Sequence, residues 1–483
     1  MSDDLDFEME VVEDDELGST ASPSEGSIKP DDAANDDRSS TELVESKEEA
    51  SSRFEGLPDA WAVHKLQEAA KVVGGSTPST NNDEYWGGDM PWATPTDVTG
   101  LRGTTITETE DKITEEGLNS ASTHILPEYS VLMTSRATIG ACAVNTVPMA
   151  TNQGFQSLVP GERLNTWYLF YRMLNEAPYL ESLGAGSTFS EVSKRVVEKV
   201  DIPVPPLPEQ RKIASVLYAV DQAIQKTEAI IEQAKRVKRG LVQDLLSSGV
   251  DSTGTIRDGS EDFKQSPCGA IPLAWEAVSL GEVAEVQGGY AFRSGDFTEK
   301  GVPVVRMSDL QEGRLDLADA RRVPDTIAQS KQDYALQVGD VLVGMSGSIE
   351  KYAVVQEEDI PCMLNQRVGR FITDSDTLLE DFLKYLVNTK NYQDQVDRMA
   401  AGAAQRNVSA SQIEQVKIPL PPVPEQRRIA NVLASIDKEI RGGISLSEDL
   451  KQLKHGLMQD LLTGEVRTMD KTIEVLGEVK AHG

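Results

Sequence analysis

Two stretches of the chain carry apolar residues at alternating spacings of three and four positions. The first stretch places them at Ile213, Leu217, Val220, Ile224, Thr227, Ile231, Ala234, Leu241 and Leu245, with Lys238 in one slot. The second places them at Ile429, Leu433, Ile436, Ile440, Leu450, Leu457 and Leu461. A repeat of about 3.5 residues buries one stripe of a helix against a partner helix, so both stretches are predicted to be strands of a coiled coil. Gly442-Gly443 predicts a kink or a frayed turn in the second helix, because glycine is a poor helix former.

The two helices belong to an internal duplication. The segments that begin at Val200 and Val416 align without a gap at an offset of 216 residues, and about half of their positions are identical. Each copy opens with a proline-rich segment, and Pro208 and Pro424 suit the first helical turn, where a missing N–H costs nothing. Weaker echoes lie upstream, since Trp61 matches Trp275. Order along the chain is therefore predicted to be globular domain, long helix, globular domain, long helix.

The predicted boundaries follow from this repeat and from changes in composition. We expect an acidic disordered tail at 1–52, a first globular domain at 53–205, a first helix at 206–250, a linker at 251–270, a second globular domain at 271–421, a second helix at 422–466 and a C-terminal tail at 467–483. Short β-rich runs (130–133, 302–305, 340–343 and 352–355) and helical stretches (165–175 and 378–399) make both globular domains mixed α/β.

Charge and cysteine content narrow the class of protein. The chain has 483 residues and a net charge of -32. Residues 1–50 hold 18 of the acids and 3 of the bases, and the remainder is still acidic. Such a surface is typical of proteins in molar salt, where self-repulsion is screened, so a halophilic host is expected. Three distant cysteines fit neither a disulfide framework nor a zinc ribbon. An acidic N-terminus and the lack of a long apolar run predict a cytoplasmic protein without a membrane span.

These motifs resemble one known family. The duplicated I-P-x-P-P-x-P-E-Q-R helix starts, the G-L-x-Q-D-L-L helix ends, the I/L-P-x-x-W openings and the stretch Ser135-Arg136-Ala137-Thr138-Ile139-Gly140 are similar to specificity subunits of type I restriction–modification systems. The resemblance covers roughly residues 54–466. It implies an α+β fold in which two target recognition domains are joined by two long helices that pair as an antiparallel coiled coil with pseudo-twofold symmetry. A helix of about 39 residues is roughly 58 Å long, or some 17 base pairs of DNA.

The resemblance implies an asymmetric, bipartite DNA site, and comparing the two halves sorts the candidate readers. Shared residues such as Asn152 and Asn365 are expected to be structural, whereas base readers should lie where the halves differ. Arg and Gln make bidentate contacts to guanine and adenine in the major groove. The predicted DNA-binding residues are Arg102, Arg136, Thr138, Ser187, Thr188, Arg293, Arg306, Ser348, Arg367, Gln405 and Arg406.

The duplicated polar residues at the helix ends are candidates for docking two identical partners. They are Glu209, Gln210, Arg211, Gln243 and Asp244 in the first copy, and Glu425, Gln426, Arg427, Gln459 and Asp460 in the second. Helix capping and ion pairs at the edge of the helix seam explain them equally well. The resemblance names the partners as double-stranded DNA, two methyltransferase subunits and restriction/translocase subunits.

No catalytic or metal-binding motif is apparent in the sequence. A Walker A motif, the Asp/Asn-Pro-Pro-aromatic motif of amino-methyltransferases and a metal spacing of the four histidines are all missing. The chain is therefore expected to be a non-catalytic subunit without its own cofactor, with S-adenosylmethionine, ATP and magnesium in partner subunits. Two alternatives stay open: a coiled-coil scaffold or adaptor without DNA readout, and a nuclease with a degenerate carboxylate site.

Overall fold

The computed structural model describes residues 53–121, 123–184, 191–258, 262–311, 313–400 and 406–468. The expected acidic tail at 1–52 lies outside the described residues, as does the C-terminal tail beyond Thr468.

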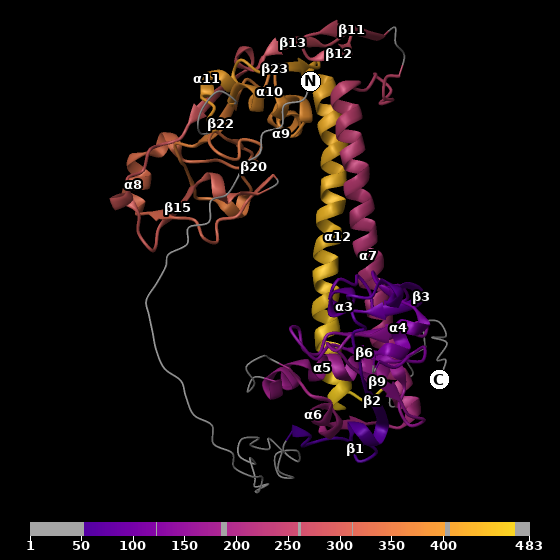
Figure 1. Ribbon diagram of the computed structural model, residues 1–483. Coiled ribbons are helices and arrows are strands. Elements are labelled where there is room, and N and C mark those ends of the chain that lie inside the picture. Colours follow the sequence, from indigo (N-terminus) through magenta and orange to yellow (C-terminus); the bar gives the residue numbers. More distant parts are fainter. Residues whose placement is uncertain are drawn as a thin grey trace, which may run out of the picture. The chain divides into compact units, whose positions relative to one another are not determined.

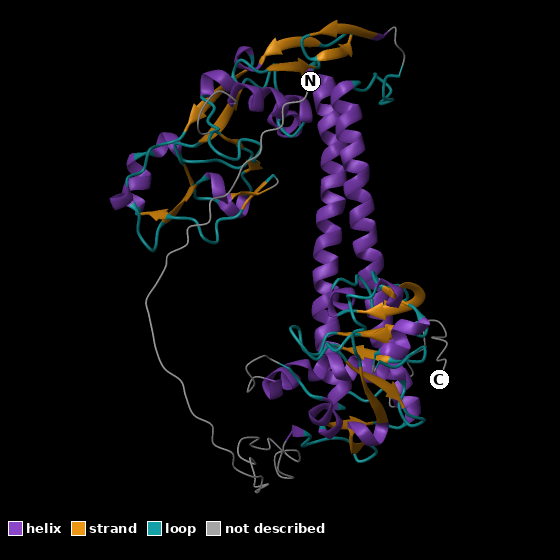
Figure 2. Cartoon of the chain, viewed as in Figure 1, coloured by secondary structure: helices purple, strands orange, loops and turns teal. Residues whose placement is uncertain are grey.

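Two helices of 41 residues each, α7 (Leu207–Ser247) and α12 (Val423–Thr463), lie side by side along most of their lengths (Figures 1 and 2). Their contacts run in opposite directions along the sequence, because Asp221 of α7 meets Lys454 of α12, whereas Lys238 meets Asp437. The prediction that the two helices pair antiparallel is therefore confirmed. We call this pair the rod.

The predicted kink or fray at Gly442-Gly443 is wrong, because α12 is helical without interruption from Val423 to Thr463. A Cβ atom at Gly443 would lie 2.9 Å from Cγ1 of Ile231 on α7. Glycine thus lets the two helices pack closely at this level, and the packing outweighs the helix propensity that glycine lacks.

The first globular domain consists of three small sheets and short helices. The five-stranded sheet has the order β2-β9-β6-β7-β4 and contains β2 (Ala70–Gly74), β9 (Gln156–Pro160), β6 (Val131–Met133), β7 (Cys142–Asn145) and β4 (Thr105–Ile106). The three-stranded sheet contains β5 (Lys112–Ile113), β3 (Trp86–Ala93) and β8 (Ala150–Thr151), and the third sheet pairs β1 (Ala62–Lys65) with β10 (Asp201–Val204). The α-helices are α2 (Leu66–Ala69), α3 (Pro95–Thr99), α4 (Glu115–Ser120), α5 (Thr166–Gly184) and α6 (Lys194–Lys199).

The second globular domain repeats this plan with different details. Its four-stranded sheet contains β14 (Ala284–Gly288), β22 (Val368–Thr373), β19 (Val341–Gly344) and β20 (Tyr352–Val354) in that order. Its smaller sheets contain β18 (Arg322–Val323), β15 (Val302–Val305) and β21 (Met363–Leu364), then β13 (Glu276–Ser279) with β23 (Lys417–Leu420), and β16 (Leu310–Gln311) with β17 (Arg314–Leu315). The α-helices are α8 (Asp325–Ser330), α9 (Glu380–Leu386), α10 (Lys390–Ala400) and α11 (Ala410–Ile413).

Both domains close in the same way. In each, a strand near the start of the domain pairs antiparallel with the last strand before the long helix. These pairs are β1 with β10, where Ala62 faces Val204, and β13 with β23, where Glu276 faces Leu420. The predicted helix at 165–175 extends further, to Gly184, and the predicted helix at 378–399 is two helices, α9 and α10. The linker at 251–270 is partly ordered, since β11 (Phe263–Ser266) and β12 (Gly269–Pro272) form a hairpin within and just beyond it.

Each globular domain shares its hydrophobic core with both helices. The first core includes Ile213 and Leu217 near the start of α7 and Leu461 near the end of α12. The second core includes Ile429 near the start of α12 and Leu245 near the end of α7. Because the helices are antiparallel, the two domains are attached at opposite ends of the rod.

Candidate nucleic-acid interface

In the first domain, a sharp turn after β6 carries two of the predicted DNA-binding residues, Arg136 and Thr138. Ala137 between them has φ of 60°, the left-handed region that a non-glycine residue seldom adopts. Arg136 and Thr138 are exposed, and the Arg136 guanidinium lies 2.8 Å from a carboxylate oxygen of Glu191. Strain of this kind gathers at functional sites, and here it holds two polar side chains at the surface.

The second domain brings three predicted residues together at the matching place. Gly347, with φ of 73°, forms the turn after β19 next to Ser348. Its N–H donates to the carbonyl of Arg406 at 2.7 Å, and the Met345 N–H donates to the carbonyl of Arg367 at 3.0 Å. The Arg406 guanidinium lies 2.5 Å from an oxygen of Asp397. Ser348, Arg367 and Arg406 therefore occupy neighbouring segments. We call this group and its counterpart in the first domain the two turn clusters.

The other predicted DNA-binding residues divide into three groups. Ser187, Thr188 and Gln405 lie outside the described residues. The Arg306 guanidinium donates to both oxygens of Asp309 and to the Asp319 carbonyl. Its hydrogen bonds are thus made within its own loop. Arg293 is exposed at the start of a short 3-10 helix (Ser294–Asp296), and Arg102 lies beside α7. Of the candidates, the turns bring Arg136 near Thr138, and Ser348 near Arg367 and Arg406; that any of them contacts DNA stays a prediction.

Asn152 and Asn365, which the two halves share, both lie where two backbone segments approach closely. The Asn152 side chain accepts a hydrogen bond from the Gly154 N–H at 2.8 Å. A Cβ atom at Gly75 would lie 2.1 Å from the Asn152 carbonyl oxygen, and one at Gly289 would lie 2.3 Å from the carbonyl of Asn365. The paired Gly and Asn positions thus allow two backbone segments to approach closely in both domains.

Four of the predicted docking residues are buried within the chain, so their assignment to partner docking is corrected. Glu209 and Gln210 are 0% exposed, Glu425 is 3% exposed and Gln426 is 0% exposed. Gln210 bonds to the backbone of Arg163, Asn165 and Pro205, and Gln426 makes the equivalent bonds to Thr377, Leu379 and Pro421. Their hydrogen-bonding capacity is used to hold each domain on its helix.

The two glutamates bind arginines that follow the opposite helix. Glu209 accepts hydrogen bonds from Arg467, at 2.7 and 3.0 Å, and from the Trp61 indole at 3.1 Å. Glu425 accepts from Arg257, at 2.5 and 3.1 Å, and from the Val250 N–H at 2.9 Å. Each bidentate pair therefore ties the start of one helix to the segment just after the other.

The remaining docking candidates stay on the surface. Arg211, Gln243, Asp244, Arg427 and Gln459 are exposed, and Asp460 is partly exposed. Because the rod is antiparallel, Arg211 and Gln459 belong to one end of the rod, and Gln243, Asp244 and Arg427 belong to the other. Their role in docking stays a prediction.

Sequence reasoning missed a duplicated Tyr–Asp–Lys contact between each domain and both helices. Tyr171 of α5 donates to Asp221 at 2.7 Å, and Lys454 of α12 lies 2.7 Å from the other oxygen of the same carboxylate.

The second domain repeats this contact. Tyr385 of α9 donates to Asp437 at 2.7 Å, and Lys238 of α7 lies 2.6 Å from its other oxygen. Burial, reinforced by the aspartate, raises the pKa of both tyrosines above the ordinary value. The available signal was Lys238 in a seam of apolar residues, with Lys454 exactly one repeat further along the chain.

Among the described residues, no group of three or more His, Cys, Asp or Glu side chains is placed to hold a metal ion. No helix in the described part of the chain is long and apolar enough to cross a membrane.

Comparisons with known proteins agree with this architecture. A family model described as the type I restriction modification DNA specificity domain matches residues 58–236 and 272–447. The specificity subunit of the type I restriction enzyme MjaVIII from Methanocaldococcus jannaschii is 27% identical over 427 residues, which cover 87% of this chain and 97% of the relative. The specificity subunit of EcoBI from Escherichia coli is 24% identical over 293 residues, or 57% of this chain and 61% of the relative.

Solved structures share the fold. The S subunit of a type I restriction–modification system from M. genitalium has a TM-score of 0.54 at 13% identity, with 84% of this chain and 96% of that chain covered. A structure from a study of complex assembly and conformational transition of the type I R-M system has a TM-score of 0.53 at 19% identity, with 85% of this chain and 99% of that chain covered.

Proposed function

The chain belongs to the type I restriction modification DNA specificity family, and on this premise we propose that it reads an asymmetric, bipartite DNA sequence for a modification and restriction complex. One observation carries the proposal: two unlike domains, each with its own turn cluster, are attached at opposite ends of one antiparallel rod. Two readers at a fixed separation select two half-sites with an unread spacer between them, and unlike readers select unlike half-sites.

The turn clusters are the proposed reading surfaces. Arg136 and Arg406 each have an acidic partner within the chain, Glu191 and Asp397. These exposed ion pairs contribute little stability, so a base edge or a phosphate can replace the carboxylate at small cost. An arginine that exchanges an acid for guanine also discriminates against bases that cannot accept its two hydrogen bonds.

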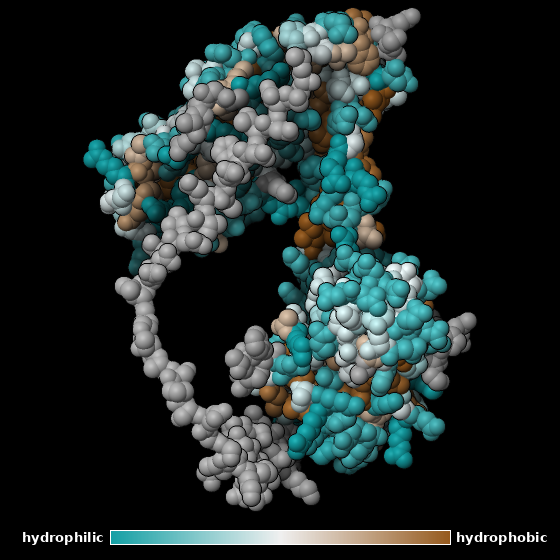
Figure 3. Space-filling view, in the orientation of Figure 1, coloured by the Kyte–Doolittle hydropathy of each residue, from teal (hydrophilic) through white to brown (hydrophobic). Residues whose placement is uncertain are grey.

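The rod offers a surface for the partner subunits. Ile230 and Val237 of α7 are 67% and 45% exposed, and Leu446 and Leu453 of α12 are 50% and 51% exposed. Apolar side chains appear on the surface of the rod in Figure 3. Within each helix the two residues are seven positions apart, and each α12 residue stands one repeat of 216 positions after its α7 counterpart. We call these four residues the apolar face.

The apolar face has the symmetry that two identical partners require. Ile230 directly precedes the seam residue Ile231. Leu446 directly precedes Ser447, which is buried and stands one repeat after Ile231. In an antiparallel pair both exposed side chains therefore lie on the same side of the seam. Clustered exposed apolar residues mark protein-interaction surfaces. Two methyltransferase subunits would therefore bind here and at the exposed polar residues of the rod ends, with restriction subunits beyond them.

We further propose that the chain supplies recognition and no catalytic group. S-adenosylmethionine, ATP and magnesium would then be bound by the partner subunits. Cleavage of DNA by the purified chain with magnesium alone would favour the nuclease alternative instead.

The decisive experiment is to sequence the methylated sites in cells that express the chain with its cognate methyltransferase. The second chain to test has residues 271–421 exchanged for the equivalent domain of another specificity subunit. The proposal predicts that one half-site changes while the other half-site is retained. A matched exchange of residues 53–205 should change the opposite half-site. A scaffold without DNA readout would leave the methylated sequence unchanged in both exchanges.

A further inference from the structure

The middle of α7 is basic in an otherwise acidic chain. Residues 222–243 contain five Lys or Arg residues and two Glu residues, while the whole chain has a net charge of -32. The net charge of this segment is therefore positive, opposite in sign to that of the whole chain. A local positive potential attracts anionic partners, so this segment is a candidate surface for an anion.

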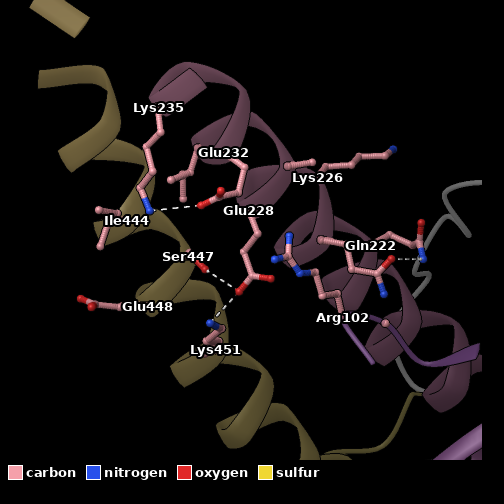
Figure 4. A pocket seen from close by; sticks show the side chains of 14 residues that line it. Arg102, Gln222, Lys226, Glu228, Glu232, Lys235, Ile444, Ser447, Glu448 and Lys451 are labelled. Carbon is pink, nitrogen blue, oxygen red and sulfur yellow. Dashed lines mark hydrogen bonds and ion pairs between the residues drawn. The ribbon is translucent and has the colours of Figure 1, made fainter. Parts of the chain in front are cut away.

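A cavity of about 750 Å³ lies over this segment, between the two helices and the first domain. Figure 4 shows Arg102, from the loop after α3, beside α7. The loop touches the helix, since a Cβ atom at Gly103 would lie 3.0 Å from the Gln225 amide nitrogen. Arg102 therefore lies over the rod, in the lining of the cavity.

Two of the acids that line the cavity, Glu228 and Glu232, already have cationic partners, whereas Glu448, also in the lining, forms no ion pair among the described residues. Glu228 lies 2.7 Å from the Lys451 ammonium and 3.5 Å from the Ser447 hydroxyl, and Glu232 lies 3.1 Å from the Lys235 ammonium. Lys235, and more weakly Arg102, lowers the pKa of Glu232. Among the described residues, Arg102 and Lys226 form no ion pair, and both are exposed. Two cations at the rim of the cavity are thus available to an external anion.

Both globular domains pack on the side of the rod that carries this cavity. Tyr171 of α5 reaches Asp221, and Tyr385 of α9 reaches Asp437. On the α7 helix, Asp221 lies two turns before Glu228, and both lie on the side of the seam opposite to Ile230. A duplex held by both domains would pass over this cavity face, and the apolar face on the other side of the rod would stay free for protein partners.

We propose that Arg102 and Lys226 bind phosphate groups of duplex DNA at the start of the unread spacer, next to the half-site of the first domain. This inference rests on the proposed function. The contact is asymmetric, because Gly442 stands where the second repeat would match Lys226. It fixes the position of the duplex on the rod and carries no sequence information, since a phosphate is the same beside every base.

The test measures DNA binding by the full chain in complex with its methyltransferase, over a four-fold range of KCl concentration. Each lost phosphate contact lowers the slope of log affinity against log salt by about 0.9. The double variant Arg102→Gln/Lys226→Gln should therefore lose about 12-fold less affinity than the wild type across that range. Arg102→Lys, which keeps the charge, should retain the wild-type slope.

Two controls separate this inference from the proposed function. Lys438→Gln removes an exposed cation of α12 that does not line the cavity, and it should leave the slope unchanged. The methylated sequence of cells with the double variant should equal that of the wild type. An unchanged slope in the double variant, or an altered base in the half-site, overturns the phosphate assignment. A wild-type complex without any sequence preference would refute the proposed function itself.

Discussion

Replacing Lys454 by Met tests whether the Tyr–Asp–Lys contacts hold the domains on the rod. The substitution removes the ammonium that lies 2.7 Å from Asp221 and keeps most of the apolar stem. The Asp221 side chain is 9% exposed, and the Tyr171 hydroxyl becomes its principal remaining partner. Removal of one partner of a fully buried ion pair costs about 3–5 kcal/mol. Lys454 is 21% exposed, so water compensates in part, and we expect a loss of about 2 kcal/mol.

The repeat provides a matched control in Lys238→Met. Its partner Asp437 is 21% exposed and Lys238 is 25% exposed, so the stranded carboxylate is better hydrated. We expect a loss of about 1 kcal/mol, the net contribution of an ordinary hydrogen bond, because water replaces the ammonium at this carboxylate. The assay is urea unfolding followed by helical circular dichroism. A Lys454→Met chain that is no less stable than the Lys238→Met chain would refute this reasoning, because the two variants differ chiefly in the burial of the carboxylate.

The sequence predicted the rod well and its contacts poorly. Alternating spacings and the exact repeat located both helices within a few residues, because a seam of apolar residues has a period that can be read from one chain. Lys238 stood out as an irregular member of the seam, but its partner Asp437 lies 199 positions away, and no local pattern connects them. The failure at Gly443 has the same origin, since the close approach of Ile231 depends on tertiary packing.

Candidate site residues were predictable only in part, for a related reason. The comparison of the halves marked Asn152 as structural, and its side chain accepts a hydrogen bond from the Gly154 N–H; the choice of Arg136 and Ser348 as DNA contacts stays a prediction. Residue type alone could not separate Arg406, in a turn cluster, from Arg306, which is bound to Asp309. The prediction that Glu209 docks a partner subunit is wrong because its side chain is buried, bound to Arg467 after the other helix. The expected halophilic host stays a prediction.

Three further predictions concern single side chains. Arg257→Ala should destabilise the chain by about 3 kcal/mol, because Glu425 is 3% exposed and loses its bidentate partner; urea unfolding measures this, and a loss below about 1 kcal/mol would contradict it. Iodoacetamide at neutral pH should label Cys268 before Cys362, because Cys362 is 1% exposed and burial raises its pKa to about 12; mass spectrometry of the native protein shows whether the order is reversed. The pKa of Tyr171 and Tyr385 is raised in the folded chain, so the stability linked to these tyrosines is present below the unfolded pKa of about 10 and is lost as pH rises beyond it. The double variant Tyr171→Phe/Tyr385→Phe should therefore show a flatter fall of the unfolding free energy at alkaline pH, and an equally steep fall would argue against it.

The most direct test of a rod that spaces two readers is to lengthen it. Insertion of one heptad at the same level in both helices, after Ala229 and after Ser445, keeps the seam in phase and adds about 10 Å to the rod. Sequencing of methylated sites should then show both half-sites unchanged and an unread spacer longer by about 3 base pairs. An active complex whose spacer keeps its original length would contradict the account.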